Sequence, residues 1–262
     1  MKDFINKIIC GDNIQVMKTL PDDCIDLTVT SPPYDNLREY QGYTFDFEAV
    51  ARQLWRVTKE GGVVVWVVGD AVINGSETCI SFKQAIGFKD IGFNIHDTMI
   101  YQKDAMPFPE RNRYNQCFEY MFVLSKGKPK TFNPIKEKTI WNKPSTPSTR
   151  RKANGTKELS KYKTGNTERS RFNIWFYGVG FNKSAKGKIP FKHPAIFPER
   201  LAQDHIISWS NKGDLILDPF CGSGTTCKMA RENHRDFIGI EISEEYCKIA
   251  NQRINNAQLS LF

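Results

Sequence analysis

Apolar residues along this chain fall into short runs that alternate with stretches of helical spacing. Within 47–58, Val50, Leu54 and Val57 recur at intervals of three and four residues, which places them on one face of a helix. The run 25–30 is rich in β-branched residues, which favour strands. The first part of the chain is therefore predicted to contain, in order, strand 8–10, helix 13–20, strand 25–30, helix 47–58, strand 63–68 and strand 120–124.

The α/β pattern is interrupted between about residues 125 and 191. Proline, serine, threonine, asparagine and lysine dominate there, and apolar periodicity is absent until 172–177. Loops of this length inside a compact domain are usually functional or disordered. From Pro194 onward the pattern returns, and we expect helix 198–207, strand 215–217, a helix over 227–230, strand 237–240 and helix 244–257.

Strands that alternate with helices predict an α/β fold with a doubly wound, mostly parallel sheet. The change of texture divides the chain into a first α/β portion over 1–125, an insert over 126–191 and a second α/β portion over 192–262. In an open sheet of this kind, ligands bind outside the carboxyl ends of the strands. The residues that follow the strands are therefore the first place to look for chemistry.

The composition excludes several classes of protein. Of the 262 residues, 40% are hydrophobic and 25% are charged, which is typical of a soluble globular protein. No apolar run reaches the ~18 residues of a membrane helix, and the first residues lack the apolar region of a signal peptide. We therefore expect a cytosolic protein that does not bind a membrane. Seven cysteines without a C-x-x-C pair and four histidines without H-E-x-x-H spacing indicate neither a disulfide framework nor a metal site.

The net charge of +8 is concentrated in the insert. Between Lys126 and Lys192 there are 18 Lys and Arg residues but three acidic ones, whereas the rest of the chain has 19 basic and 26 acidic residues. A basic segment on a mildly acidic body suggests a polyanionic partner such as nucleic acid. A solvated, partly disordered surface segment is the alternative that composition leaves open.

The first strand end whose residues could bind a ligand is followed by the loop 218–226. Gly222 and Gly224 allow a tight turn and a close approach to a ligand, and a helix N-terminus lies just beyond them. Glu241 ends the next predicted strand, where a carboxylate can accept both hydroxyls of a ribose. A plain strand-to-helix turn would explain the glycines alone, and a phosphate loop is not indicated because no G-K-[ST] sequence follows. The combination favours a nucleoside cofactor.

The second strand end is Ser31-Pro32-Pro33-Tyr34. Two prolines fix the backbone and remove two donors, so that the carbonyls of Ser31 and Pro32 and the Ser31 hydroxyl face outward. Tyr34 adds a flat aromatic surface. Two acceptors beside an aromatic ring suit the exocyclic amine of a base, although a rigid loop without chemistry would have the same sequence.

Together these elements resemble the β group of bacterial amino-methyltransferases that act on DNA. Residues 31–34 match the catalytic S/D-P-P-Y motif of that group, and 218–225 match its cofactor loop. Ile240-Glu241 resembles the ribose-binding strand end, Gly11-Asp12 the element that reads the adenine, and 192–198 the segment that packs around the methionine moiety. The resemblance covers about three quarters of the chain, and the unmatched basic insert lies where this group carries its target-recognition region.

The resemblance implies a Rossmann-like methyltransferase fold with a seven-stranded type of sheet in circularly permuted order, and S-adenosyl-L-methionine as cofactor. Residues 1–125 would be the catalytic part of the domain, 126–191 the target-recognition region and 192–262 the cofactor-binding part. Because the permutation joins the usual chain ends, strands 8–12 and 237–241 are expected to be neighbours. The implied catalytic residues are Ser31, Pro32, Pro33 and Tyr34; the cofactor-binding residues are Asp12, Thr30, His193, Pro194, Phe197, Asp218, Pro219, Phe220, Gly222, Ser223, Gly224, Thr225, Glu241 and Ile242; the DNA-binding residues are Arg150, Arg151 and Lys152; no metal is implied.

The expected mechanism is direct transfer to a base amine. Ser31 Oγ and the Pro32 carbonyl would accept hydrogen bonds from the two N–H groups and so direct the nitrogen lone pair toward the methyl group. The same acceptors would stabilise the charge that develops on nitrogen. The base would flip out of the duplex and stack on Tyr34. No covalent intermediate is expected, because the chain has no Pro-Cys dipeptide. Serine at the first motif position favours N4 of cytosine in this group, and N6 of adenine is the alternative.

Other classes stay open at this point. A methyltransferase acting on RNA or protein glutamine would use a related N-P-P-Y motif, and a DNA-binding module could keep the fold without catalysis. For the main interpretation, the expected partners are double-stranded DNA and a cognate restriction endonuclease, in a cytoplasmic, nucleoid-associated, bacterial-type protein. Both a monomer and a homodimer are compatible with the sequence.

Overall fold

The computed structural model describes residues 1–33, 45–104, 112–139, 148–160, 167–185, 190, 196 and 198–257. The chain forms two compact units. The main unit comprises Met1–Asn133 and Asn173–Phe262, and the insert unit comprises Pro134–Phe172. The insert unit thus lies within the segment 126–191 that the charge pattern distinguishes.

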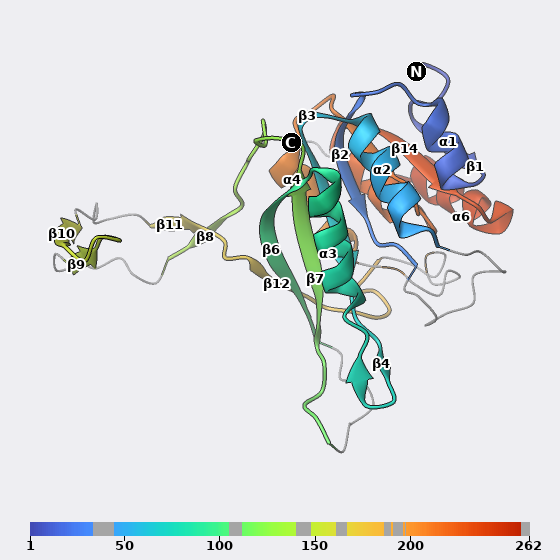
Figure 1. Ribbon diagram of the computed structural model, residues 1–262. Coiled ribbons are helices and arrows are strands. Elements are labelled where there is room, and N and C mark those ends of the chain that lie inside the picture. Colours follow the sequence, from blue (N-terminus) through green and yellow to red (C-terminus); the bar gives the residue numbers. More distant parts are fainter. Residues whose placement is uncertain are drawn as a thin grey trace. The chain divides into compact units, whose positions relative to one another are not determined.

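A single eight-stranded sheet organises the main unit (Figure 1). Its strands are, in spatial order, β1 (Lys7–Cys10), β14 (Asp236–Glu241), β13 (Leu215–Asp218), β2 (Ile25–Thr30), β3 (Thr58–Val68), β7 (Phe118–Ser125), β6 (Asn94–Lys103) and β12 (Ile174–Tyr177). A short hairpin of β4 (Val72–Ile73) and β5 (Ser76–Glu77) follows β3. All neighbours in the large sheet pair in parallel except β7, which is antiparallel to both β3 and β6. The prediction of a mostly parallel α/β sheet is confirmed.

The first and last strands along the chain, β1 and β14, lie side by side, as the permuted order predicts. Strand β1 pairs in parallel with β14, and in this register Ile9 is opposite Ile240 and Cys10 is opposite Glu241. The chain therefore brings its residues 11–12 next to the end of β14. Strand β12 is an eighth strand beyond the expected seven; its Trp175 and Tyr177 are buried in the main unit, whereas Ile174 and Phe176 on the opposite face are exposed.

Helices cover the sheet in two layers (Figure 1). One layer contains α1 (Asn13–Thr19), α2 (Phe47–Val57) and α3 (Ile80–Ile91), and the other contains α4 (Glu199–Trp209), α5 (Thr225–Glu232) and α6 (Glu244–Asn255). The predicted face of α2 is buried in the core, with Val50, Leu54 and Val57 inaccessible to solvent. Helix α3 was not predicted; its Gly87 weakens helical propensity, but a Cβ at this position would lie 2.6 Å from the Phe47 ring, so the glycine allows α2 and α3 to pack closely.

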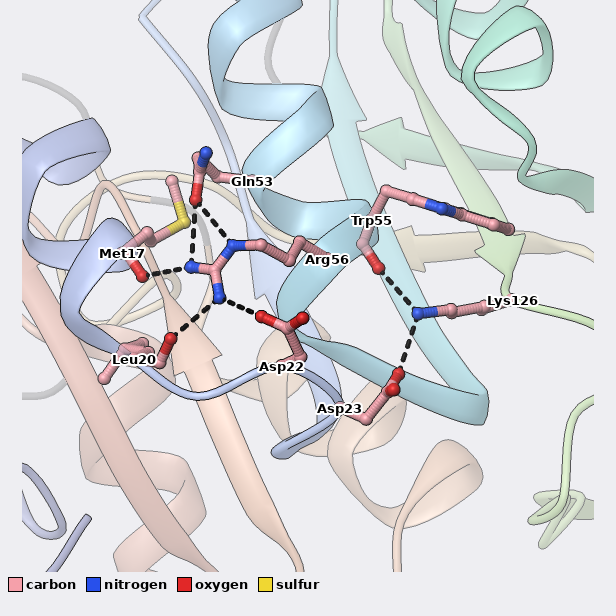
Figure 2. A network of polar contacts seen from close by, with 8 residues as sticks. All are labelled: Met17, Leu20, Asp22, Asp23, Gln53, Trp55, Arg56 and Lys126. Carbon is pink, nitrogen blue, oxygen red and sulfur yellow. Dashed lines mark hydrogen bonds and ion pairs between the residues drawn. The ribbon is translucent and has the colours of Figure 1, made fainter.

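The start of β2 is anchored by two cations (Figure 2). Arg56 of α2 donates to the carbonyls of Met17 (2.6 Å) and Leu20 (2.8 Å) at the end of α1. Lys126 donates to the Asp23 carboxylate (2.7 Å) and to the Trp55 carbonyl (3.0 Å). These contacts hold the connection between α1 and β2, and thereby fix the position of the strand that leads to Ser31.

The chain leaves two adjacent strands in opposite directions. Strand β13 leads through α5 to β14 on one side, and β2 leads through α2 to β3 on the other. The switch point of the sheet therefore lies between the carboxyl ends of β13 and β2. In doubly wound folds this crevice is where ligands bind.

The insert unit contains two small antiparallel pairs. Strand β8 (Lys136–Lys138) pairs with β11 (Glu168–Ser170), and β9 (Ser148–Arg151) pairs with β10 (Lys157–Ser160). Arg169 makes an ion pair with Glu137 (2.8 Å), and its guanidinium lies 3.9 Å from the centre of the Phe172 ring. In neither unit is a described helix long and apolar enough to cross a membrane.

Candidate active site

Four parallel strands end side by side at one edge of the main sheet. They are β1, β14, β13 and β2, and the residues at or just after their ends are Asp12, Glu241, Asp218 and Ser31. These are the strand ends that the sequence distinguishes, although they come from opposite ends of the chain. The topology therefore gathers the predicted residues at the switch point of the sheet.

A buried hydrogen bond joins the two central strand ends. Thr30 Oγ1 donates to Asp218 Oδ1 at 2.7 Å, and the backbone N–H of Phe220 donates to the same oxygen at 3.1 Å. Thr226 Oγ1 adds a bond to the Val29 carbonyl at 3.0 Å. Thr30 and Asp218 are both buried, so their side chains hold strands and loop together at the crevice.

Burial raises the pKa of the Asp218 carboxyl to about 6, and the hydrogen bonds from Thr30 and Phe220 oppose this shift. Removal from water disfavours the charged form more than these donors favour it. Asp218 therefore titrates closer to neutral pH than an exposed aspartate does.

The S-P-P segment begins directly after this bond. Ser31 and Pro33 are half-buried and Pro32 is buried, so the segment extends from the anchored end of β2. The fourth residue of the motif, Tyr34, lies outside the described residues. The same is true of three predicted cofactor contacts, His193, Pro194 and Phe197.

The loop after β13 has a backbone that requires glycine. Gly222 and Gly224 have φ angles of 48° and 78°, in the left-handed region that other residues rarely adopt. A Cβ at Gly224 would also lie 2.8 Å from the Cβ of Ala250 in α6. The loop is thus pressed against α6 and ends at the N-terminus of α5.

Packing explains the cysteine in this loop. Cys221 and Cys227 are buried, and a Cβ at Gly239 in β14 would lie 2.7 Å from Cys227 Sγ and 3.2 Å from Cys221 Sγ. The neighbouring Cys227 thiol and burial raise the pKa of Cys221 well above its ordinary value. A thiol that stays protonated is a poor nucleophile, so Cys221 has a packing role here.

The Glu241 carboxylate is oriented by backbone donors. Its Oε2 accepts from the N–H of Gly222 at 2.9 Å, and its Oε1 accepts from the N–H of Ser243 at 2.9 Å. Burial raises the pKa of Glu241, although these backbone bonds oppose the shift. Each carboxylate oxygen can accept more than one hydrogen bond, so the half-exposed group retains capacity for two hydroxyls. Beside it, the apolar side chain of Ile242 is 49% exposed.

The end of β1 is tied to the same loop. Asp12 caps α1 by accepting from the N–H of Gln15 at 2.9 Å, and Gly11 donates its N–H to the Glu241 carbonyl. Asn13 Nδ2 donates to the carbonyl of Pro219, a buried residue, at 3.2 Å.

Phe220 packs edge-on against Phe45 and Trp66 in the core, at centroid distances of 5.5 and 6.2 Å. The residues after β1 and β13 thus form one connected wall.

Asp70, at the end of β3, has a structural role. The Ser81 N–H donates to Asp70 Oδ1 at 3.0 Å, and the Ser81 hydroxyl donates to the other carboxylate oxygen. The carboxylate therefore supports the start of α3.

Sequence reasoning missed Arg253 of α6. Its side chain is buried, and Nη1 donates to the carbonyl and hydroxyl of Ser223 (both 2.6 Å) and to Thr225 Oγ1 (3.1 Å). The side chains of Ser223 and Thr225 therefore point toward α6. The available signal was an arginine three residues after Ala250 and four after Ile249, a spacing that places it on the apolar face of the helix.

The predicted DNA-binding residues lie in the insert unit. Arg150, Arg151 and Lys152 are exposed, and Lys152 makes an ion pair with Glu158 at 3.0 Å. In the β9–β10 register, Arg150 is opposite Glu158 and Arg151 is opposite Lys157. Among the described residues, no group of three or more His, Cys, Asp or Glu side chains could hold a metal ion.

Comparison with known proteins identifies similar chains over nearly the whole length. A family model described as DNA methylase (N6_N4_Mtase) matches residues 25–252. The orphan methyltransferase M.BamHII of Bacillus amyloliquefaciens is 58% identical over 245 residues, which are 92% of this chain and 92% of that one. The type II methyltransferase M.SmaI of Serratia marcescens is 26% identical over 290 residues, covering 95% of this chain and 90% of the relative.

Solved structures share the fold at low sequence identity. The PvuII DNA methyltransferase, described as cytosine-N4-specific, is 20% identical with a TM-score of 0.69, covering 97% of this chain and 87% of that one. A putative DNA modification methylase from Thermus thermophilus, solved in complex with S-adenosyl-L-methionine, is 24% identical with a TM-score of 0.63, covering 96% and 95%. Both likenesses concern the fold.

Replacement of Asp218 by asparagine is expected to change how stability depends on pH. A carboxyl whose folded pKa is raised above its unfolded value stabilises fully below the unfolded pKa and loses this contribution as pH rises through the folded pKa. Asp218→Asn can keep the bond from Thr30 without a buried charge. Relative to the wild type, it should therefore gain stability between about pH 4 and pH 7, by on the order of 2–3 kcal/mol.

The measurement is the free energy of unfolding of both proteins by denaturant titration across this pH range, without ligand. Glu48→Gln is the matched control, because Glu48 is an exposed carboxylate paired with Arg52 on α2. Parallel pH profiles for the wild type and Asp218→Asn would contradict the raised pKa.

Proposed function

Because this chain belongs to the DNA methylase family, we propose that it transfers a methyl group from S-adenosyl-L-methionine to the exocyclic N4 amine of a cytosine in duplex DNA. The observation that carries the proposal is the Thr30–Asp218 hydrogen bond of 2.7 Å between the ends of β2 and β13. It joins the strand that leads to Ser31-Pro32 to the strand that leads to the glycine loop. A methyl donor on the loop and an amine held by Ser31 would then be neighbours.

The residues at the strand ends fit a nucleoside with a charged sulfonium. The Glu241 carboxylate, held by Gly222 and Ser243, would accept the ribose hydroxyls. Asp12 and Ile242 stand beside it at the ends of β1 and β14, where an adenine would contact one polar and one apolar side chain. When bound, S-adenosyl-L-methionine supplies an electrophilic methyl group on a positively charged sulfur.

Ser31 and Pro32 would act on the amine. The lone pair of an aromatic amine is conjugated into the ring, so the nitrogen is a weak nucleophile until its hydrogens are held out of the ring plane. Ser31 Oγ and the Pro32 carbonyl would accept hydrogen bonds from those two N–H groups and stabilise the positive charge that develops on nitrogen. As the N–CH3 bond forms and the S–CH3 bond breaks, S-adenosylhomocysteine would be the leaving group and one N–H proton would pass to solvent. Because β2 is anchored at both ends, by the contacts of Arg56 and Lys126 and by Asp218, these acceptors are positioned before the substrate arrives.

The target amine is paired inside the duplex, so the base must leave the stack to reach Ser31. We propose base flipping, at a cost of a few kcal/mol, with Tyr34 as the stacking partner. The insert would supply part of the binding energy, since the exposed Arg150, Arg151 and Lys152 can contact phosphates. Serine at position 31 supports cytosine as the target base, and N6-adenine methylation is the competing outcome.

Chromatographic analysis of a nucleoside digest tests the target base. DNA incubated with the protein and labelled S-adenosyl-L-methionine should yield N4-methylcytosine and no N6-methyladenine. RNA and protein offered as alternative acceptors should stay unlabelled. Appearance of the label in N6-methyladenine would support amino-methyltransferase activity but would contradict cytosine as the target base.

Replacement of Ser31 by alanine tests the mechanism. Loss of one of the two acceptors should lower the turnover number by about 100-fold or more, on the scale measured for other preorganised transition-state contacts. Cofactor affinity by calorimetry should stay close to that of the wild type, because the loop 218–226 is unchanged. Thr19→Ala at the exposed end of α1 is the control for loss of a hydroxyl. Near-normal turnover of Ser31→Ala would remove Ser31 from the mechanism.

The salt dependence of DNA binding tests the role of the insert. The triple variant Arg150→Gln, Arg151→Gln, Lys152→Gln should bind duplex DNA more weakly, and the slope of log affinity against log salt should be shallower by about 0.9 for each phosphate that the variant no longer neutralises. The control removes equal charge from exposed positions of α1 and α3 through Lys18→Gln, Lys83→Gln and Lys89→Gln. Equal slopes for the two triple variants would exclude these three residues from the interface.

A further inference from the structure

A buried ion cluster lies behind the glycine loop, and Arg253 of α6 is its centre. The Arg253 side chain is 4% exposed. Its Nη1 makes three hydrogen bonds to the loop, two to Ser223 at 2.6 Å and one to Thr225 at 3.1 Å. Its Nη2 donates to Glu199 Oε1 at 2.8 Å. One rigid guanidinium therefore connects α6, the loop and the first residue of α4.

Ser223 and Thr225 are engaged by α6. Both residues are buried, and their hydroxyls accept from Arg253. The resemblance implies that Ser223 and Thr225 bind the cofactor, which leaves open whether side chain or backbone does so. The structure directs these side chains to the protein interior, so the loop would offer its backbone to a ligand, and Arg253 would determine where that backbone lies.

Glu199 connects the cluster to the start of α4. It directly follows Pro198, the last residue of the segment 192–198 that resembles the methionine-binding segment. Its Oε1 accepts from both Arg253 Nη2 and Lys228 Nζ, at 2.8 and 2.7 Å. Its backbone N–H donates to the Ser184 carbonyl at 2.8 Å. A shift of Arg253 would therefore move the glycine loop and the start of α4 together.

The cluster is better suited to positioning the glycine loop than to stabilising the fold. Burial lowers the pKa of Arg253, and the bond and charge of Glu199 oppose the shift. The desolvation of two buried charges offsets much of their attraction, so a buried ion pair adds little net stability compared with apolar packing. A planar guanidinium with fixed donors does impose positions on its acceptors. Here most of its hydrogen bonds go to the loop.

We propose that Arg253 is a positioning residue for S-adenosyl-L-methionine, which sets the glycine loop against the start of α4 through Ser223, Thr225 and Glu199. The inference rests on the proposed function, because it assigns the ligand of the loop. It adds a residue outside the motifs that carry the resemblance. Arg253 acts through the loop and does not touch the reacting atoms.

The test compares Arg253→Gln with the wild type by calorimetric titration of S-adenosyl-L-methionine and of S-adenosylhomocysteine. We expect the Kd of both ligands to rise at least tenfold in Arg253→Gln. In turnover assays the KM for S-adenosyl-L-methionine should rise, while the KM for DNA and kcat at saturating cofactor stay within about threefold. Arg253→Lys, which keeps the charge facing Glu199 but loses the planar fork, should give an intermediate Kd.

The matched control is Arg52→Gln, which breaks an Arg–Glu pair that is exposed on α2. Its ligand affinities should equal those of the wild type. A folded Arg253→Gln protein, with a lower Tm but with a Kd within twofold of the wild type, would overturn the proposal and leave Arg253 a purely structural role. If Arg253→Gln does not fold, Glu199→Gln decides by the same criterion, since it weakens the bond to Arg253 while it keeps the shape of the side chain.

The wild-type titration separates this inference from the function on which it rests. Absence of S-adenosyl-L-methionine binding by the wild type would overturn the proposed function and the inference with it. Binding by the wild type together with equal binding by Arg253→Gln would reject the inference alone.

Discussion

The arrangement of the site depends on the hydrogen bond that Thr30 donates to Asp218. These residues end strands β2 and β13, which pair in parallel although their sequences are almost two hundred residues apart. The bond lies in the crevice where the chain turns away on both sides, so it fixes the distance between the S-P-P segment and the glycine loop. The Asp218 carboxyl is buried beside this bond, and burial raises its pKa although the bond itself favours the charged form.

Most of the sheet could be predicted from the sequence, because its strands have strong local signals. Runs such as 63–68 and 215–217 are apolar throughout, as buried parallel strands usually are. The adjacency of β1 and β14 also followed, since it depends only on the permuted order of the motifs. Helix α3 and strands β6 and β12 were missed for physical reasons. Gly87 of α3 has a packing role against Phe47, β6 buries few of its side chains, and β12 is a short edge strand at the end of a polar insert.

The candidate site was predictable where its chemistry lies in contiguous residues. Ser31, Gly222, Gly224 and Glu241 all stand at strand ends that the sequence distinguishes. The direction of the side chains was not predictable, because it is decided by contacts between segments that are distant in sequence. Ser223 and Thr225 belong to the glycine loop, but their hydroxyls face a guanidinium nearly thirty residues further along. An arginine inside an amphipathic helix carries only a weak local signal.

The interleaved order of the strands determines how this protein could be divided. The insert unit separates a sequence segment with β1, β2 and β3 from one with β13 and β14, yet in the sheet β13 and β14 lie between β1 and β2. Two polypeptides produced by a break inside the insert would each hold half of the crevice, the S-P-P segment on one and the glycine loop on the other. Their reunion would have to form the β1–β14 and β13–β2 pairs at once. The fold is thus a natural starting point for a split enzyme whose activity reports the encounter of two fragments.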